Sequence, residues 1–267
     1  MMQAPAASLV VGRWLLPLCA GILLGAMIGL FAKPMVSEPD AGQESFDNGL
    51  LVTQQLDSLF RVVESQLQED ASNLASHREL LDTFQAYDRL YVQQPSVDPA
   101  TQLAKAYAAR RLGHGCQALG ELEDAGEYYR QSRDLFAACL QADPHAIDLY
   151  SLWLNAHTQI IYVELTRGDL DAAKHEYHIA VGALQQPALT QDFDYHKSMM
   201  LELKALAELG IELKLYAEAM QVAERFAFSA KVLTDRSPND AALAQDAEDA
   251  QLYLRILSSL LRQQEKL

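Results

Sequence analysis

The segment Gly-Glu-Leu-Glu-Asp-Ala-Gly-Glu-Tyr-Tyr, residues 120–129, decides the fold because a close copy of it follows 48 residues later. That copy is Gly-Asp-Leu-Asp-Ala-Ala-Lys-His-Glu-Tyr, residues 168–177, and a weaker third copy, Leu-Tyr-Ala-Glu-Ala-Met-Gln-Val-Ala, occupies residues 215–223. The alanines that align are Ala125, Ala173 and Ala219, spaced by 48 and 46 residues. A regular period of this length indicates a repeat architecture, in which each unit buries its apolar face against its neighbours.

Each copy has the composition expected where a second helix packs back on a first. Alanine lets two helices approach closely, and a tyrosine one turn later, Tyr129 or Tyr177, fills the space beside it. Gly and Pro number only 13 and 9, and half of the 267 residues are hydrophobic, which favours helices around a substantial core. The sequence therefore predicts an all-α fold of stacked helical hairpins.

Helix boundaries follow from capping residues, prolines and apolar periodicity. A helix is expected to begin at the proline wherever a capping side chain directly precedes it, at Asp98-Pro99, Asp143-Pro144 and Ser237-Pro238. The pattern as a whole predicts helices over residues 48–69, 72–93, 98–118, 121–141, 144–167, 170–185, 190–213, 216–235 and 238–264. We interpret the last helix as a cap on the stack, with a coiled-coil contact as the alternative.

The repeated residues resemble the tetratricopeptide repeat (TPR), in a long-period bacterial form. The family's Leu-Gly pair, its turn, and its small residue with a tyrosine four positions later are matched by Leu112-Gly113, by Gly120-Glu121 and Gly168-Asp169, and by Ala125/Tyr129 and Ala173/Tyr177. The chain departs from the family in its period, which exceeds the usual 34 residues by more than ten. It also departs in having Lys214 in place of the third turn glycine and Ile160-Ile161 in place of the second Leu-Gly. The resemblance covers residues 98–236 and implies a right-handed α-solenoid that binds other proteins.

Residues 14–32 contain no charged side chain and predict one transmembrane helix before the repeats. At about 1.5 Å per residue the run spans roughly 28 Å, close to the thickness of a hydrocarbon core. A cleaved signal peptide is the alternative, but its apolar region is shorter, and Leu30-Phe31-Ala32 makes a poor cleavage site. We expect a stub at 1–13, a retained anchor at 14–32, a linker at 33–47 and a TPR-like domain at 48–267.

The charges that flank this run predict its orientation. Arg13 and the α-amino group precede it, whereas Lys33 follows it directly and Glu38, Asp40, Glu44 and Asp47 lie further along the linker. Positive charge on the short side predicts a cytoplasmic N-terminus. The expectation is a bacterial inner-membrane protein with a single span and a periplasmic main domain.

Gly21, Gly25 and Gly29 recur at every fourth position of the predicted span. On a helix they form one smooth stripe that a second helix can approach closely, which predicts a homodimer contact or a dock for another membrane helix. The alternative is the general abundance of glycine in membrane helices.

The bulk charge narrows the classes of partner. A formal charge of -15 disfavours nucleic acid, because phosphate binding needs a basic face, and it favours another protein as the partner. The alternative is a solvated surface charge that only maintains solubility. No phosphate-binding glycine loop, nucleophile elbow or zinc-protease motif occurs in the sequence. His175 and His178 lie one helical turn apart without a third ligand nearby, so we interpret them as surface residues. We expect no enzyme activity, no cofactor and no metal.

The resemblance also implies where a partner binds. In TPR arrays the first helix of each hairpin lines an inner groove, and carried onto this chain the lining residues are Tyr107, Arg110, Arg111, His114, Asn155, Thr158, Tyr162, Lys204 and Glu208. Arg110 and Arg111 are notable in so acidic a chain and are candidates for gripping a carboxylate. The alternative is that they lie on a solvated face or pair with neighbouring acids.

Together these features predict a membrane-anchored scaffold or adaptor that grips a peptide or helix during assembly of a cell-envelope complex. Two other classes stay open: a ligand-sensing helical domain, and a purely structural subunit of a membrane complex.

Overall fold

The computed structural model describes residues 99–184 and 193–265, together with residues 82, 85, 86, 88, 89, 92 and 93. All of them belong to the unit Asn48–Leu267. This described part is built of helices and contains no strand, which confirms the all-α prediction. The predicted span 14–32, its glycine stripe, the linker 33–47 and the helix at 48–69 lie outside the described residues. None of the helices among the described residues is both long and apolar enough to cross a membrane.

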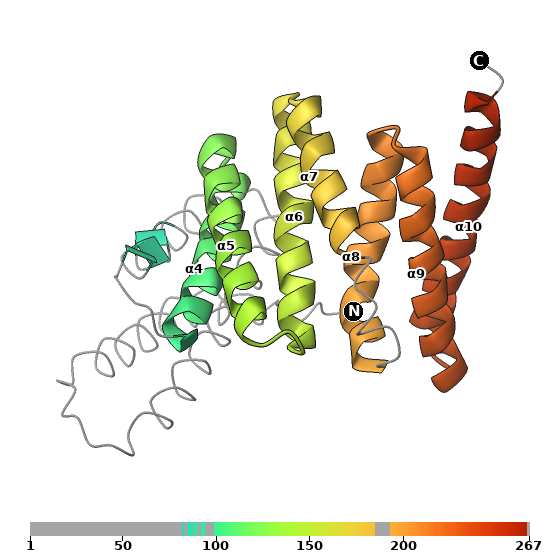
Figure 1. The fold of residues 1–267 in the computed structure, drawn as a ribbon, viewed down its shortest axis with the longest axis horizontal. Coiled ribbons are helices and arrows are strands. Elements are labelled where there is room, and N and C mark those ends of the chain that lie inside the picture. The colour runs from blue at the N-terminus through green and yellow to red at the C-terminus, as the bar shows by residue number, and fades with distance from the viewer. Residues whose placement is uncertain are drawn as a thin grey trace, which may run out of the picture. The chain divides into compact units, whose positions relative to one another are not determined.

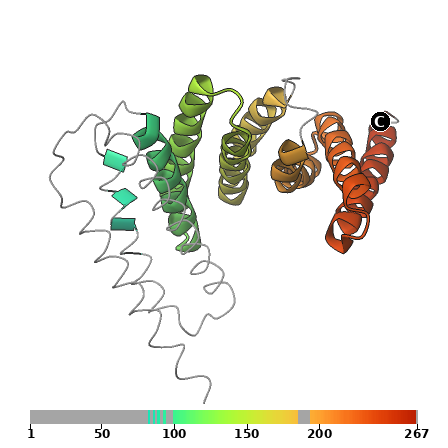
Figure 2. The ribbon, with the colours of Figure 1, turned by 90° about the horizontal axis from the view of Figure 1, so that it is seen from below.

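Seven helices lie in the two described ranges 99–184 and 193–265. They are α4 (Pro99–Ala118), α5 (Leu122–Ala142), α6 (Ile147–Arg167), α7 (Leu170–Ala183), α8 (Phe193–Glu212), α9 (Tyr216–Arg236) and α10 (Ala241–Gln264). Each boundary lies within three residues of the predicted one. Figures 1 and 2 show the helices following one another in chain order, with α4–α5, α6–α7 and α8–α9 as hairpins and α10 beside α9.

The three hairpins share one turn geometry. One residue in the turn after each first helix has a positive φ angle, 78° at Gly120, 81° at Gly168 and 60° at Lys214. The next amide in each turn donates to a carbonyl five residues earlier, as from Glu121 N to Cys116 O at 2.8 Å. Asp169 N to Glu164 O and Leu215 N to Gly210 O are both 2.9 Å. The third repeat thus keeps the turn without its glycine, although a left-handed conformation strains a lysine.

Two of the three helix starts predicted at prolines are wrong. Helix α4 begins at Pro99, but Pro144 and Pro238 precede helices that begin at Ile147 and Ala241. At Pro144 the chain first forms a turn, in which Ala146 N donates to Asp143 O at 3.2 Å. Proline fits the second position of such a turn and disfavours helical geometry in the residue before it.

The same turn precedes α10, where Asp240 N donates to Ser237 O at 3.1 Å. The cap of α10 is therefore Asp240, whose carboxylate accepts from Ala242 N at 2.9 Å and Leu243 N at 3.3 Å. The sequence predicted Ser237, directly before Pro238, as the capping residue, whereas the helix is capped by Asp240, two residues after the proline.

The aligned alanines lie in the core, as predicted. Ala125, Ala173 and Ala219 are fully buried, and so are Tyr129 and Tyr177. Burying small residues at helix contacts lets the hairpins stack at close range.

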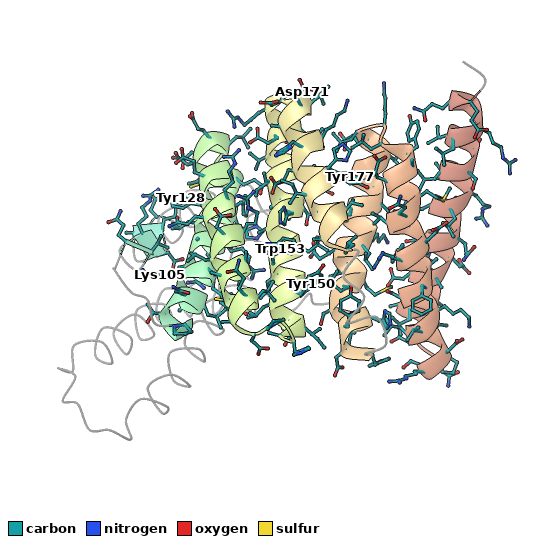
Figure 3. The ribbon with its side chains drawn as sticks, in the orientation of Figure 1. Lys105, Tyr128, Tyr150, Trp153, Asp171 and Tyr177 are labelled. Carbon is teal, nitrogen blue, oxygen red and sulfur yellow. The ribbon has the colours of Figure 1, made fainter. Side chains whose placement is uncertain are left out.

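The two tyrosines reach different neighbours. Tyr129 lies over Gly113 of the same hairpin, where an added Cβ would meet its ring at 2.6 Å. In the second hairpin Ile161 fills the equivalent position, and Tyr177 instead places its hydroxyl against Gly210 of α8. Figure 3 labels Tyr177 on α7 and, lower in the view, Trp153 and Tyr150 of α6. Each tyrosine thus packs against a glycine. For Tyr129 this glycine belongs to the same hairpin, and for Tyr177 it belongs to the next hairpin.

Candidate functional site

Side-chain contacts place the first helices α6, α8 and α10 next to one another. Between α6 and α8, Asn155 Nδ2 donates to Glu202 Oε1 at 3.0 Å and Thr158 Oγ1 donates to Glu202 Oε2 at 2.8 Å. Between α8 and α10, Lys204 Nζ donates to Asp249 Oδ2 at 2.6 Å.

The turns give the register of this layer. Gly168 and Lys214 occupy the same place in their turns and are 46 residues apart, which aligns Asn155 with Leu201. The turns before α6 and α10, at Asp143 and Ser237, are 94 residues apart and extend the alignment. We call the aligned set the first-helix face: Asn155, Thr158 and Tyr162 of α6, Leu201, Lys204 and Glu208 of α8, and Asp249, Leu252 and Ile256 of α10.

On α4 the predicted partner-binding residues are largely packed within the protein. Arg111 is buried and forms a two-pronged ion pair with buried Asp88, with N–O distances of 2.9 and 2.7 Å. A guanidinium held in this way is not offered to a partner, so pairing with a neighbouring acid is the interpretation that holds for Arg111. Sequence separation hid the pair, because Asp88 lies 23 residues earlier.

The other three α4 residues contact aromatic rings. Tyr107 packs edge-on against Phe136 with ring centroids 5.5 Å apart, and the guanidinium carbon of buried Arg110 lies 5.8 Å from the centroid of Tyr107. His114 packs edge-on against Tyr129 at 5.3 Å. The electrostatic potential of Arg110 and His114 also lowers the pKa of Glu202 of α8 in part.

Asn155 and Thr158 meet at Glu202, which sequence reasoning missed. Thr158 is buried and its hydroxyl also lies 2.8 Å from Leu154 O, within α6. Burial raises the pKa of Glu202 above its ordinary value, although both hydrogen bonds and the potential of Arg110 lower it in part. Glu202 follows Leu201 directly and does not align with any predicted groove residue, so the repeat pattern gave no reason to select it.

Lys204 and Glu208 of α8 both contact α10, and Tyr162 of α6 lies near Glu208. Lys204 pairs with Asp249 and lies 3.7 Å from Asp246, and the hydrogen bond to Asp249 raises its pKa. Exposed Glu208 accepts a hydrogen bond from the hydroxyl of Tyr253 on α10. Burial, followed by the negative potential of Glu208, raises the pKa of half-buried Tyr162.

The first-helix face also carries exposed apolar side chains that the sequence analysis did not select. Leu201 is 76% exposed, and Leu252 and Ile256 are 45% and 38% exposed. Leu201 occupies the position of Tyr107 and Asn155 in the repeat register, so the register itself was the signal that could have found it. These three are half of the six most exposed large hydrophobic residues in the part of the chain that the structure describes.

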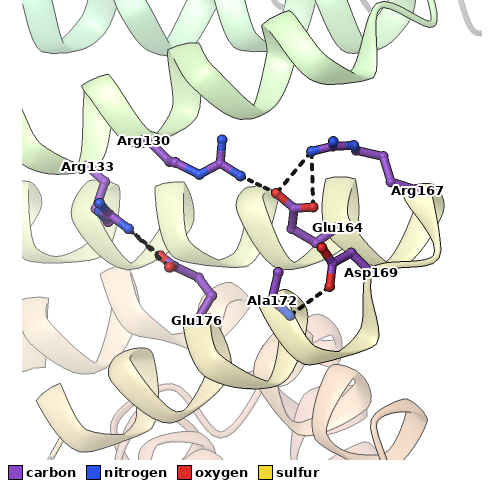
Figure 4. A network of polar contacts seen from close by, with 7 residues as sticks. All are labelled: Arg130, Arg133, Glu164, Arg167, Asp169, Ala172 and Glu176. Atoms are coloured by element: carbon purple, nitrogen blue, oxygen red, sulfur yellow. Dashed lines mark hydrogen bonds and ion pairs between the residues drawn. The ribbon is translucent and has the colours of Figure 1, made fainter.

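A second set of polar contacts joins α5 to α6 and α7 (Figure 4). Arg130 pairs with buried Glu164, which also lies 3.2 Å from Arg167. Arg133 Nη1 lies 2.9 Å from Oε1 of buried Glu176. These ion pairs join one hairpin to the next, and each arginine and glutamate in them is paired with an opposite charge. We therefore interpret them as structural.

Glu176 has a further partner in His157, whose Nδ1 lies 2.6 Å from Oε1. Burial alone would raise the pKa of Glu176, but His157 and Arg133 outweigh it, so the pKa lies below its ordinary value. The carboxylate is therefore held in its charged form.

Cys116, Glu121 and Asp124 bring one thiol and two carboxylates within 4.8 Å of one another. Burial, with the nearby charges of Glu121 and Asp124, raises the pKa of Cys116 to about 11, so the thiol stays protonated near neutral pH. Metal ligation requires the thiolate, and both carboxylates are exposed to water. His175 and His178 are exposed on α7, and His178 Nδ1 lies 3.8 Å from Glu218.

Comparison with known proteins adds little to this geometry. No model of a known protein family matches the chain, and no curated protein matches it. Among solved structures the chain is similar to one described as the crystal structure of BtubC (BKLC) from P. vanneervenii. The two are 13% identical, with a TM-score of 0.38, and the match covers 86% of this chain and 94% of that chain. A likeness at this level identifies neither a family nor a function.

Proposed function

We propose that this protein is a scaffold or adaptor that binds another protein through the first-helix face. One observation carries the proposal: Leu201, Leu252 and Ile256 remain exposed on equivalent sides of neighbouring helices. Single exposed leucines are common, but apolar side chains gathered on one face mark a contact surface. In this proposal the helices form a right-handed α-solenoid of TPR-like hairpins, and the first helices face the partner.

The cellular setting of the proposal comes from the sequence. Residues 14–32 anchor the protein in the bacterial inner membrane, the N-terminus is cytoplasmic, and the repeats act in the periplasm during assembly of an envelope complex. Gly21, Gly25 and Gly29 supply a contact for a second copy or for another membrane helix. The first-helix face offers apolar side chains and charged groups suited to binding another protein.

The proposal is tested by affinity capture with the full chain in detergent extracts of its own membranes. The double variant Leu201→Arg/Leu252→Arg places charge on the first-helix face, and Ile179→Arg is the matched control, because Ile179 is 40% exposed on α7, a second helix. We expect a stoichiometric protein partner with wild type and with the control, and its loss from the double variant.

Two results would overturn this assignment of the face. One is equal recovery of the partner by all three proteins. The other is a thermal shift with small metabolites and no protein recovered by the wild type, which favours ligand sensing. Circular dichroism of the variants confirms that each one is folded before capture is compared.

A further inference from the structure

We infer that the part of the first-helix face formed by α8 and α10 binds an amphipathic helix whose apolar stripe is interrupted by basic residues. The inference rests on the proposed function and specifies its partner. It is drawn from three features of this surface: where the apolar side chains lie, which charges lie beside them, and whether the backbone has free hydrogen-bonding groups.

The apolar side chains stand at a definite spacing. Lys204 and Asp249 are paired and therefore lie at one level, while Leu201 precedes Lys204 by three residues and Leu252 follows Asp249 by three. At about 1.5 Å per residue the two leucines are offset by about 9 Å along the helices. Packed helices lie about 8–10 Å apart, so the leucines are about 13 Å from each other.

That spacing matches a helical partner. Residues seven or eight positions apart lie on the same side of a helix and about 11–12 Å apart along its axis. Leu252 and Ile256, one turn apart on α10, form a short ridge against which such a stripe can pack. An extended strand would need a free backbone edge for hydrogen bonding, whereas the amides and carbonyls within α8 and α10 are satisfied inside their helices.

The charges beside the apolar positions select a basic partner. Glu208 and Glu212 of α8 are exposed, and Asp249 of α10 is half-buried beside Lys204. Asp249 and Asp246 lie 2.6 and 3.7 Å from the ammonium group of Lys204, while Glu208 and Glu212 are exposed further along α8. Lys197 lies one turn before Leu201 at the edge of the surface. A lysine or arginine of the partner near the residues that contact Leu252 and Ile256 would meet Glu208 and Glu212, while an acidic residue there would be repelled.

The test measures binding of three labelled 18-residue peptides to the purified full chain in detergent, by fluorescence anisotropy at low salt. The first is an amphipathic helix with leucines at positions 3, 7, 10 and 14 and lysines between them. The second replaces the lysines with glutamates, and the third replaces the leucines with serines. The protein variants are Leu201→Asp, Glu208→Lys and the control Ile179→Asp.

We expect the first peptide to bind at least tenfold more tightly than either of the others. Leu201→Asp weakens its binding at least fivefold, Glu208→Lys weakens it and reduces its salt dependence, and Ile179→Asp leaves it unchanged. Equal binding of the lysine and glutamate peptides would overturn the inference, and so would an effect of Ile179→Asp as large as that of Leu201→Asp.

The same peptides separate this inference from the proposed function. A partner that is captured through Leu201 and Leu252, combined with no preference among the peptides, leaves the face as a binding surface and removes the basic helix as its occupant. Concentration-dependent self-association that is lost in Leu201→Asp would identify a second copy as the occupant and likewise overturn the inference.

Discussion

Two helix contacts enclose a carboxyl group: the contact of α5 with α6 and α7, and the contact of α6 with α8. The surroundings lower the pKa of the carboxyl group in the first contact and raise it in the second. Glu176, between α5 and α7, faces Arg133 and His157, which hold it ionised. Glu202, between α6 and α8, is held by the neutral donors of Asn155 and Thr158, and its pKa is raised. The first contact is secured by charge near neutral pH, whereas the second would be tighter if its carboxyl were protonated.

Removing the arginine from the charged contact has the largest expected effect on stability. Arg133→Ala leaves Glu176 buried with His157 as its remaining partner, and loss of one member of a buried pair costs about 3 kcal/mol. Urea unfolding measures this loss. The matched control is Lys231→Ala, which breaks an exposed pair with Asp235 and is expected to cost at most about 0.5 kcal/mol. Equal costs for the two variants would remove the distinction between buried and surface pairs.

Glu176→Gln tests the same contact from the acidic side. Because the folded-state pKa of Glu176 is depressed, its contribution is present above the unfolded pKa and is lost as pH falls through the folded value. The variant is therefore less stable than wild type at pH 7 by about 2 kcal/mol, and this difference shrinks as the pH falls toward 3. A difference that stays constant with pH would show that charge plays no part in this contact.

Glu202→Gln is expected to have the opposite sign and a smaller size. The folded-state pKa of Glu202 is raised, so its favourable contribution is present below the unfolded pKa and is lost as pH rises through the folded value. Glutamine cannot ionise, and its amide can donate to Thr158, whose own hydroxyl can donate to Leu154 O. The variant should match wild type near pH 4 and gain about 0.5–1 kcal/mol at pH 7. A loss at pH 7 would show that the carboxylate is needed in its charged form.

An effect of similar size is expected at the turns that close the hairpins. Lys214 holds a φ of 60° where the first two repeats have glycine, so Lys214→Gly should raise the free energy of unfolding by about 1 kcal/mol. Gly168→Lys is the reverse change and should lower it by a similar amount. Differential scanning calorimetry of both variants compares the turns directly, and shifts of the same sign would contradict their equivalence.

Sequence reasoning predicted what is local or periodic. The helices and the buried alanines follow from a repeat that recurs through Ala125, Ala173 and Ala219, and each boundary depends on residues within one turn. Pro144 misled because a proline suits both the first turn of a helix and the second position of a β-turn. The choice between the two was made by hydrogen bonds that the sequence pattern does not specify.

The candidate surface was predicted in part. The register selected Lys204 and Glu208, which the structure shows in contact with α10. It passed over Leu201, which is apolar and 76% exposed. Arg111, predicted to face a partner, is instead paired with Asp88. The two residues are 23 positions apart in the sequence, and a pair so widely separated leaves no local sequence pattern. Packing between hairpins decides which of the aligned side chains remain at the surface.

The most direct measurement of the central claim is site-specific photo-crosslinking in living cells, with a photoreactive amino acid at Leu201 in one strain and at Ile179 in another. Both side chains are exposed, one on the first-helix face and one on a second helix. The account predicts a discrete crosslinked protein product from position 201 and none from position 179. Crosslinking from position 179 alone, or equal products from both positions, would contradict it.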